Sequence, residues 1–578
     1  MVSIVILTYN KLDYTKLCID SIRKYTPKGS YEIIIVDNNS TDGTVEWLNE
    51  QSDLIKILNK ENLGFPKGCN QGIEIAKGEY ILLLNNDTIV TENWLNNMLI
   101  CINSDDSIGA VGTVTNYCSN YQTISTQYKS IDEMHIFAAK HNVSSPNLWE
   151  DRLKLVGYCM LIRKDIVDRI GMLDERFTPG NFEDDDYSVR ILKAGFRLVL
   201  CKDTFIHHFG STSFKEDTGK YHQLLLDNQI KFEEKWGFNP IYSGFIRNEI
   251  VDMIDDSEDS NINVLEVGCA CGATMLKIKS KYKNAGLFGI ELNENAAQIA
   301  GLFSHTSTAN IEDADLGYEN AFFDYIIFAD VLEHLNNPWD VLKNIKRYLK
   351  PEGKILASIP NVMHYSVLKS LLNGFWTYQD AGILDRTHLR FFKHVEIIKM
   401  FKAAGYEEID LNRTMIPASN EDSAFIDKLC SITSNELRIQ YESYQILVKA
   451  SERKSDSNIK SILLDISKNI NFKSNCEKLS CYTHEQIIDC IVKYIDNKVD
   501  ILNNLAIWLF EKGNYNDILL YLDRAFSISS NDQDTLYNLA YVLNYIGEKK
   551  IAEKYVDMIK VRDEQVEKLA LSIKGIGM

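Results

Sequence analysis

The sequence predicts an α/β protein with two parallel-sheet domains in series and an all-α tail. Short β-branched runs alternate with amphipathic helical segments over residues 1–245, and the same alternation returns over residues 246–418. Such alternation is typical of parallel sheets covered by helices. A chain of 578 residues is too long for one core, and roughly 150 residues per domain predicts three or four domains. The rest of the chain is predicted as a helical linker region, residues 419–495, and a helical repeat region, residues 496–578.

Composition narrows the class of protein. The formal net charge is −19, whereas a nucleic-acid-binding protein carries a basic face, so that class is disfavoured. The 12 cysteines are scattered, and the pair Cys269 and Cys271 has no second ligand cluster nearby, which indicates reduced thiols and no zinc site. The apolar start is too short for a signal peptide, and no run of about 18 apolar residues could cross a membrane. We therefore expect a cytoplasmic protein with no transmembrane segment and no nucleic-acid partner.

Three apolar runs in the first domain predict buried strands, and each run ends in a polar cluster. The runs are VSIVILTYN, YEIIIVDNNSTDGT and GEYILLLNNDT, with helical segments such as residues 13–25 and 67–76 between them. Their polar ends are Thr8-Tyr9-Asn10, Asp37-Asn38-Asn39 and Asn85-Asn86-Asp87. Ligands of parallel α/β sheets bind beyond the carboxyl ends of the strands. The three clusters therefore predict a ligand site at one edge of the sheet.

These clusters belong to a longer series of motifs in a fixed order. The series continues with ENLGFPKGCNQG at 61–72, GYCMLIRK at 157–164 and FEDDDYSVR at 182–190. With them, residues 2 to about 240 resemble a family 2, GT-A-fold glycosyltransferase, of the branch that includes rhamnosyl- and N-acetylglucosaminyltransferases. The resemblance implies an inverting enzyme with a UDP- or dTDP-sugar as nucleotide-sugar donor. The residues that it implies for donor binding are Thr8, Asn10, Asp37, Asn62, Gly64 and Asn86.

The same resemblance implies a divalent metal site. A departing diphosphate builds negative charge in the transition state, and Mn²⁺ or Mg²⁺ bridging the two phosphates would stabilise that charge. Asp87 corresponds to the last residue of the metal-binding triplet, whose first residue is Asn85 here, so one carboxylate remains. A histidine of the segment FIHHFGSTS commonly completes the site in this family, and His207 is favoured over His208.

The four acids at residues 183–186 offer the base that the acceptor hydroxyl requires. By motif position Asp184 is the base, with Glu183 beside it, whereas Asp186 and Arg190 are expected to orient the loop and the helix. The alternative is that the run is a solvated helix N-terminus, where acids are stabilised by the helix dipole.

In the second domain, the strand NVLEVG runs into a turn of small residues. Gly268, Ala270 and Gly272 allow backbone to approach a ligand closely before a helix begins. The next strand ends in Glu291, and an acid at that position can bind ribose hydroxyls. Several dinucleotide folds share such a turn, so the later motifs decide: FFDYIIFADVLEHL, LKPEGKILASIPN and DRTHLRFF follow in order.

With these motifs, residues 246–418 resemble a class I S-adenosylmethionine-dependent methyltransferase with a Rossmann-like fold. Ala270 stands where the family has its middle glycine, and Asn310 with Ile311 falls where the adenine is contacted. His334 and His388 are candidates for the general base or the acceptor contact; alternatively they are a helix-end histidine and a packed loop histidine. The residues implied for binding S-adenosylmethionine are Glu266, Gly268, Ala270, Gly272, Glu291, Asn310 and Asp330.

The last region repeats itself at a period of 34 residues. Asn504, Leu505-Ala506 and Gly513 return as Asn538, Leu539-Ala540 and Gly547. The period resembles tetratricopeptide repeats, which are helix pairs that bury their apolar faces by stacking. The region is either a docking groove for a protein partner or a scaffold tail.

Together these patterns predict a bifunctional enzyme that adds a sugar to a glycan and methylates it. Bacterial surface glycans and flagellin glycosylation are the expected setting. One alternative is a methyltransferase domain that modifies a non-sugar group, such as an amine. Another is a scaffold whose repeats bind protein while one catalytic domain is inactive. The sequence leaves open the donor sugar and whether the acceptor is a protein, a glycan or a lipid-linked sugar.

Overall fold

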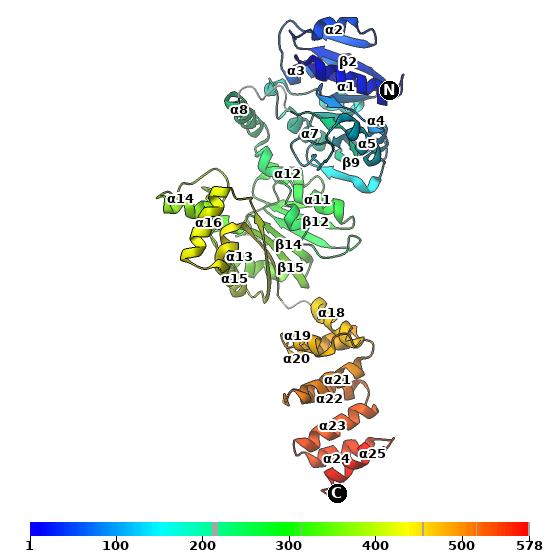
Figure 1. Ribbon diagram of the computed structural model, residues 1–578, viewed down its shortest axis with the longest axis vertical. Coiled ribbons are helices and arrows are strands. Elements are labelled where there is room, and N and C mark those ends of the chain that lie inside the picture. Colours follow the sequence, from blue (N-terminus) through cyan, green and yellow to red (C-terminus); the bar gives the residue numbers. More distant parts are fainter. Residues whose placement is uncertain (211–217, 314, 453–455, 516, 576–578) are drawn as a thin grey trace. The chain divides into compact units, whose positions relative to one another are not determined.

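The computed structural model describes residues 1–210, 218–313, 315–452, 456–515 and 517–575. The chain divides into two compact units. The first comprises residues 1–405 and 409–450, and the second comprises residues 406–408 and 451–578. The predicted strand and helix alternation of the first unit and the helical character of the second are both present (Figure 1).

The amino-terminal domain is built on an eight-stranded mixed sheet in the order β3-β2-β1-β4-β8-β6-β9-β7. Strands β1, β2, β3 and β4 are parallel, β8 is antiparallel to both of its neighbours, and β7 is antiparallel to β9. The strands are β1 (Val2–Thr8), β2 (Tyr31–Asp37), β3 (Leu54–Leu58), β4 (Tyr80–Leu84), β6 (Ile108–Val114), β7 (Trp149–Arg152), β8 (Cys159–Arg163) and β9 (Arg197–Phe205). A short antiparallel pair, β5 (Thr88–Ile89) with β10 (His207–His208), lies outside this sheet.

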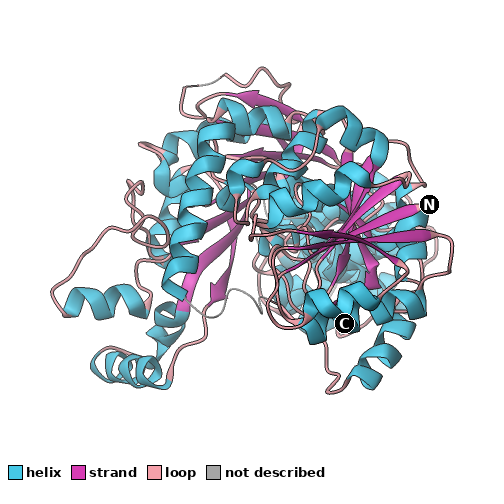
Figure 2. Ribbon diagram, turned by 90° about the horizontal axis from the view of Figure 1, so that it is seen from above, coloured by secondary structure: helices cyan, strands magenta, loops and turns pink. Residues whose placement is uncertain are grey.

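Both faces of the sheet are buried because successive side chains of each strand enter different cores. Val5 and Ile34 belong to one core cluster, whereas Ile4 and Ile33 belong to another. Strands buried on both faces consist of continuous apolar runs, as in β1, and the strands near the N-terminus fan out with the usual sheet twist (Figure 2). The helices and 3₁₀ turns of this domain are α1 (Leu12–Tyr25), α2 (Thr44–Glu50), α3 (Phe65–Ile75), α4 (Trp94–Ile102), α5 (Ile131–His141), η1 (Pro146–Leu148), α6 (Lys164–Ile170), η2 (Glu175–Phe177), α7 (Glu183–Lys193) and α8 (Thr218–Trp236).

The second domain carries a seven-stranded sheet in the order β13-β12-β11-β14-β15-β17-β16. The first four pairings along this order are parallel. The strands are β11 (Asn263–Val267), β12 (Gly286–Glu291), β13 (His305–Thr308), β14 (Phe323–Ala329), β15 (Leu349–Pro360), β16 (Glu408–Met415) and β17 (Ser443–Ser451). The helices and 3₁₀ turns are α9 (Pro240–Ser243), α10 (Asn248–Val251), α11 (Ala273–Lys281), α12 (Glu294–Ala300), η3 (Leu332–His334), α13 (Pro338–Ile345), η4 (Lys346–Tyr348), α14 (Tyr365–Leu372), α15 (His394–Ala403), α16 (Asn420–Ile432), η5 (Asn435–Leu437) and α17 (Arg438–Glu442).

Strand β17 differs from the sequence prediction, which places a helical linker over residues 419–495. The strand lies between β15 and β16 in the second sheet, so this domain extends past residue 418. Ile446, Leu447 and Val448 are each at most 3% exposed. Their burial on both faces of the sheet explains why this short run becomes a central strand despite its helical flanks.

The second unit is a series of helices. Gly513 and Gly547, which follow α21 and α23, have φ angles of 75° and 92° and end the first helix of each predicted repeat. The helical prediction is confirmed, and the assignment to tetratricopeptide repeats stays a prediction. The helices are α18 (Asp456–Ser467), α19 (Phe472–Leu479), α20 (His484–Tyr494), α21 (Lys498–Glu511), α22 (Ile518–Ile528), α23 (Gln533–Tyr545), α24 (Lys549–Met558) and α25 (Glu564–Ile573).

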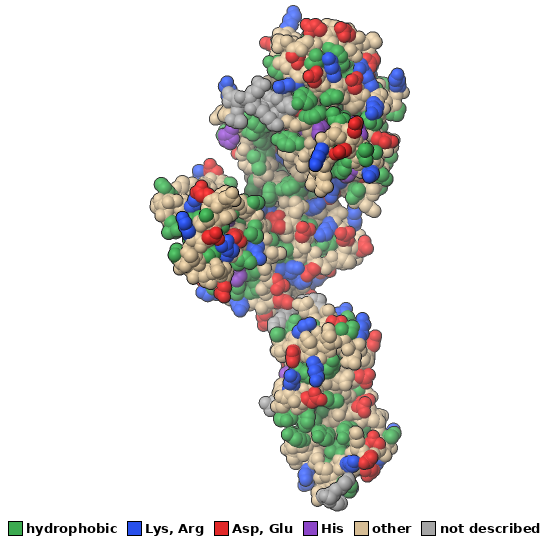
Figure 3. Space-filling model, viewed as in Figure 1, with side chains coloured by type: hydrophobic (Ala, Val, Ile, Leu, Met, Phe, Trp, Pro, Cys, Tyr) green, Lys and Arg blue, Asp and Glu red, His purple; other side chains and the backbone are tan. Residues whose placement is uncertain are grey.

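Two surface properties bear on the predicted partners. Among the described residues, no helix combines the length and the apolar character that a membrane crossing requires. On the face drawn in Figure 3, acidic and basic side chains are interspersed, with no continuous basic stripe on that side.

Candidate active sites

The carboxyl ends of β1 and β2 lie side by side, since Thr8 is paired with Asp37 in the sheet register. Asp37 is fully buried. Its Oδ2 accepts a hydrogen bond from the Ser40 amide at 3.0 Å, whereas Oδ1 has no hydrogen-bond partner in the part of the chain that the structure describes. A buried carboxylate oxygen without a donor is costly. Asp37 Oδ1 therefore offers a hydrogen-bond acceptor to a bound ligand, and the nucleoside contact expected from its position stays a prediction.

The predicted turn at Asn62 and Gly64 closes against the end of β2. Asn38 Nδ2 donates to Asn62 Oδ1 and to the Gly64 carbonyl, both at 3.1 Å. Gly64 has a φ of 81°, and a Cβ there would lie 2.7 Å from Thr178 Cγ2 and 2.9 Å from Pro179 Cα. The turn therefore requires glycine at this position.

Thr8, Asn10 and Asn86 fix the loops around this edge. Asn86 Nδ2 donates to Thr8 Oγ1 at 3.3 Å and to Thr15 Oγ1 at 3.0 Å. Asn10 Oδ1 accepts from the Thr41 amide at 2.7 Å. The three predicted residues come together at one edge, where these contacts hold the strand ends in place.

Asp87 and His208 form a buried pair beside this edge. His208 Nε2 lies 3.1 Å from Asp87 Oδ1, and His208 Nδ1 lies 2.7 Å from the Tyr117 carbonyl. Because a carbonyl only accepts, Nδ1 carries the proton and Nε2 faces the carboxylate. Two ligands at right angles, each about 2.1 Å from one ion, are about 3 Å apart. The two side chains therefore fit a divalent ion with nitrogen and oxygen ligands.

The sequence favours His207 as the metal ligand, whereas the geometry favours His208, which lies beside Asp87. His207 Nδ1 lies 2.7 Å from the Tyr128 hydroxyl, and burial lowers the pKa of His207 to about 4. The two histidines form strand β10, so their side chains leave opposite sides of the strand. Residues 211–213 of the predicted segment lie outside the described residues.

Asp184 lies in the first turn of α7, and its pKa is raised. Its Oδ2 accepts from the Gly157 amide at 2.9 Å. Burial, then the charge of Asp185, raises the pKa of Asp184 to about 6. Burial, then the charge of Asp184, raises the pKa of Glu183 well above its ordinary value, and Glu183 Oε2 has no hydrogen-bond partner among the described residues. Asp184 is thus the acid that ionises near neutral pH, which suits a general base.

The other two acids of the run are engaged in ion pairs. Lys154 Nζ lies 2.5 Å from Asp185 Oδ1. Asp186 is fully buried and binds Arg190 Nε at 2.9 Å and Lys235 Nζ at 2.5 Å. This burial excludes the alternative of a solvated helix N-terminus.

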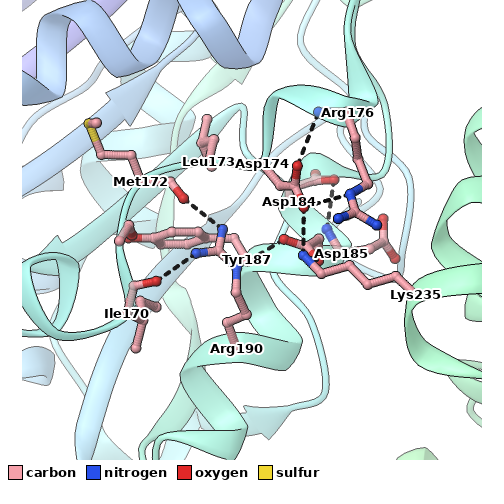
Figure 4. Close-up of polar contacts among 12 residues, drawn as sticks. Ile170, Met172, Leu173, Asp174, Arg176, Asp184, Asp185, Tyr187, Arg190 and Lys235 are labelled. Atoms are coloured by element: carbon pink, nitrogen blue, oxygen red, sulfur yellow. Dashed lines mark hydrogen bonds and ion pairs between the residues drawn. The ribbon is translucent and has the colours of Figure 1, made fainter.

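Arg190 links α7 to the preceding loop. It donates to the carbonyls of Ile170 and Met172 at 2.9 and 2.8 Å, and Figure 4 shows its guanidinium directed at both. Lys235 also donates to Asp174 at 2.7 Å. The charged groups beside Asp184 therefore hold the helix and the loop in register.

In the second domain, the turn after β11 has a left-handed backbone at three positions. Gly268, Ala270 and Gly272 have φ angles of 69°, 48° and 84°. A Cβ at Gly268 would lie 2.7 Å from Val331 Cγ2. Glu291, at the end of β12, accepts from the Ala270 amide at 2.7 Å. The turn and the strand-end acid are thus adjacent, as a ribose site requires.

Glu266 is a buried acid under this turn. It is 4% exposed, and its Oε2 has no hydrogen-bond partner in the described ranges. Burial raises the pKa of Glu266 to about 8, an effect that the charge of Arg247 partly offsets. The unsatisfied oxygen and the glycine turn fit a cofactor that brings a positively charged or hydrogen-bond-donating group.

Asn310 and Asp330 occupy different surroundings. Asn310 follows β13, is exposed, and donates to Asp313 at 2.8 Å. Asp330, with a φ of 53°, accepts from Ser358 Oγ at 2.7 Å, from Gln445 Nε2 at 2.8 Å and from Arg247. The sequence did not predict Arg247 and Gln445 as site residues. Arg247 lies at the predicted domain joint, and Gln445 lies on β17, a strand that the sequence did not predict.

His334 and His388, the two candidates for the general base or the acceptor contact, lie side by side in the structure. Their ring centroids lie 4.7 Å apart. Glu333 directly precedes His334 in the chain, and its Oε1 lies 3.9 Å from His388 Nε2. Burial lowers the pKa of His334, so its imidazole is neutral near pH 7. Glu333 and His334 are adjacent within the motif FFDYIIFADVLEHL.

The comparisons with known proteins assign the two domains. Residues 3–171 match the family model described as Glycosyl transferase family 2, and residues 242–411 match the one described as Methyltransferase domain. The chain joins a family 2 glycosyltransferase domain to a methyltransferase domain. With the two sheets and the helical tail, these matches confirm the predicted fold class: a GT-A-type domain, a Rossmann-like domain and an all-α region.

Individual relatives each match one domain. Glycosyltransferase GlyG of Streptococcus pneumoniae is 26% identical over 215 residues, which is 36% of this chain and 68% of that protein. A ubiquinone biosynthesis O-methyltransferase of Idiomarina loihiensis is 28% identical over 206 residues, 34% of this chain and 82% of that protein. The structure of a mannosyltransferase from Pyrobaculum calidifontis with GDP-Man and Mn²⁺ is 20% identical, covers 40% of this chain and 64% of its own, and has a TM-score of 0.30.

Proposed function

We propose that the chain transfers a sugar from a nucleotide-sugar donor with inversion and then methylates the glycan from S-adenosylmethionine. The observation that carries this proposal is the presence of two assembled sites on one compact unit. The domains also share contacts: Lys277 Nζ lies 2.8 Å from Glu150 Oε1, and Cys271 and Ile299 belong to the core of the first domain.

In the glycosyltransferase site, the chain's own residues bind the donor and move the proton. Asp37 holds the nucleoside, and the Asn62–Gly64 turn closes over it. Mn²⁺ or Mg²⁺, held by Asp87 and His208, would neutralise charge on the diphosphate. Asp184 accepts the proton of the acceptor hydroxyl as that oxygen attacks the anomeric carbon. Attack opposite to the leaving group inverts the anomeric configuration.

In the methyltransferase site, alignment and exclusion of water do most of the work. Gly268, Ala270 and Gly272 cradle the cofactor, Glu291 holds its ribose and Glu266 binds at the buried end of the turn. S-adenosylmethionine supplies an electrophilic methyl group, and an in-line displacement by a hydroxyl requires close positioning. His334 and His388 face the acceptor side.

The setting that fits both chemistries is assembly of a bacterial surface glycan or a flagellin glycan in the cytoplasm, from a UDP- or dTDP-sugar. A protein partner docked on the C-terminal repeats belongs to the same proposal. A second candidate follows from the similarity to a ubiquinone biosynthesis O-methyltransferase: a non-sugar hydroxyl as methyl acceptor. A scaffold with an inactive domain is disfavoured, since Asp87, Asp184, Gly268 and Glu291 are all present.

The test uses the purified full chain with a panel of nucleotide sugars, Mn²⁺ and S-adenosylmethionine, followed by mass spectrometry of the acceptor. The Gly268→Asp product should carry the sugar and lack one methyl per modified sugar. The Asp184→Asn product should lack both. Methyl transfer to the acceptor by Asp184→Asn would contradict the sequential order and favour a different methyl acceptor.

A further inference from the structure

Glu333, His334 and His388 bring three potential ligand atoms within 4.8 Å of one another in the methyltransferase domain. We propose that these residues bind a divalent transition-metal ion, separate from the ion at Asp87 and His208.

Glu333 is a buried acid whose carboxylate oxygens accept no hydrogen bond from the described residues. It is 1% exposed, and neither carboxylate oxygen has a hydrogen-bond partner among the residues that the structure describes. A buried carboxylate without donors is strongly unfavourable unless it takes up a proton or a cation binds it. The Arg247 guanidinium, whose charge acts on Glu333, bonds with Asp330. A metal ion from outside the protein would satisfy both oxygens of Glu333 by replacing that proton.

The two histidines are fixed in the form that binds metal. His388 Nδ1 lies 3.0 Å from the Ile383 carbonyl, and His334 Nδ1 lies 3.3 Å from the Thr387 carbonyl. Since a carbonyl can only accept, each Nδ1 carries the proton and each Nε2 keeps its lone pair. A backbone carbonyl on the outer nitrogen is the usual support of a metal-binding histidine.

The backbone ties the three ligands together. The Glu333 carbonyl accepts from the amides of Leu389 and Arg390 at 2.9 and 3.0 Å, directly after His388. His388 Nε2 lies 3.9 Å from Glu333 Oε1, which is too long for a hydrogen bond. Ligands around one ion, each about 2.1 Å from it, are roughly 3–3.5 Å apart. Small side-chain rotations would therefore close the cluster onto an ion.

Two histidines and one carboxylate form a donor set for Zn²⁺, Fe²⁺, Mn²⁺ or Co²⁺, with less preference for Ca²⁺ or Mg²⁺. Three protein ligands leave coordination positions open, as in catalytic metal sites. The expected occupant of those positions is an acceptor with neighbouring oxygens, such as a sugar diol.

The role in catalysis rests on the proposed methyltransferase function. An acceptor hydroxyl on the ion would lose its proton to solvent more readily. Its oxygen then forms a bond to the methyl carbon, and the carbon–sulfur bond breaks with its electron pair remaining on sulfur. The sulfonium becomes a neutral thioether, so charge and atoms balance.

The experiment titrates Co²⁺ into the full chain carrying Asp87→Ala and His208→Ala, which remove the other metal pair. We expect about one equivalent of Co²⁺ with visible d–d absorption and no sulfur-to-cobalt charge-transfer band. Adding Glu333→Gln or His388→Asn should weaken binding at least ~30-fold. The matched control is His364→Asn, another buried histidine of the same domain, which should bind Co²⁺ unchanged.

The proposal is overturned if the background protein, folded by circular dichroism, binds no Co²⁺, or if Glu333→Gln binds it as tightly. If the Glu333 and His388 variants unfold, the proposal is still tested by Co²⁺ titration of the Asp87→Ala, His208→Ala protein and by its thermal stabilisation by Zn²⁺. Metal binding without methyl transfer to any acceptor would support this site and defeat the proposed methyltransferase function. Unchanged methyl transfer by metal-free protein would support the proposed methyltransferase function and overturn the metal site.

Discussion

His208 Nε2 lies 3.1 Å from Oδ1 of Asp87, although 121 residues separate the two along the chain. The pairing of β5 with β10 brings them together, since His208 is opposite Thr88 in that register. The first position of the triplet, where a second carboxylate would stand, is Asn85. An imidazole thus stands next to the single carboxylate of the triplet, and we propose that the two together would hold a divalent ion.

Removal of either member of this pair should lower sugar transfer. We expect Asp87→Ala and His208→Ala to reduce turnover about 10²-fold or more, since charge on the departing diphosphate loses its stabilisation. Nucleotide release with titrated Mn²⁺ is the measurement, and EDTA should inhibit the unsubstituted chain. His207→Gln, beside the pair on β10, is the control and should retain activity. A crippled His207→Gln with an active His208→Ala would reverse the assignment.

Sugar transfer should depend on pH through Asp184. A base must be ionised, and the pKa of Asp184 is raised to about 6. The ratio kcat/KM should therefore rise about tenfold per pH unit below 6 and level off above it. Asp184→Asn should lose this limb and fall about 10²-fold, with little change in donor affinity. Glu183→Gln mimics the protonated acid and should remain active; the opposite pattern would move the base to Glu183.

Cofactor binding should depend on the missing side chain at Gly268. Gly268→Ala introduces a Cβ 2.7 Å from Val331 Cγ2 and strains a backbone with a φ of 69°. We expect S-adenosylmethionine affinity to fall at least ~10-fold by calorimetry, with sugar transfer unchanged. Val331→Ala should restore part of the loss, because it relieves the clash and leaves the strain. No loss in Gly268→Ala would place the cofactor elsewhere.

The stability of the methyltransferase domain should fall as pH rises through the titration of Glu266. Its pKa is raised to about 8 from an ordinary 4.5, so the folded state holds a proton that the unfolded chain releases. The stabilisation is complete below about 4.5 and is lost as pH rises through about 8. Glu266→Gln should match the unsubstituted chain near pH 5 and exceed it at pH 9 by a few kcal/mol. Calorimetric unfolding without cofactor at both pH values tests this; equal stability at pH 9 would contradict it.

Much of the fold could be predicted because the strands of both sheets are continuous apolar runs with polar ends. The ends of β1, β2 and β4 converge as expected, since parallel strands end at one edge. Strand β17 could not be predicted in the same way. Its pairing partners lie far away in the sequence, and a helical segment precedes it, so local periodicity favours a helix there.

The candidate sites likewise contain residues that the sequence predicts and residues that only the tertiary structure brings together. Asp184 and Glu291 could be proposed from motifs alone, because each occupies a fixed position in a recognisable motif. The choice between His207 and His208 depended on which face of a two-residue strand meets Asp87, and that face is set by the tertiary pairing with β5. Glu333 and His388 are 55 positions apart, and the tertiary structure brings them together, with the Glu333 carbonyl accepting from the amides of Leu389 and Arg390.

The position of β17 between β15 and β16 has a consequence for how the protein is made. A chain leaving the ribosome presents β15 and β16 well before residues 443–451 have been synthesised. During that interval β15 has an open edge and β16 has no neighbour to pair with in the sheet, a state that invites association with other chains. The nascent domain therefore depends on timely arrival of its last strand, and premature termination after residue 418 would make that exposed intermediate permanent.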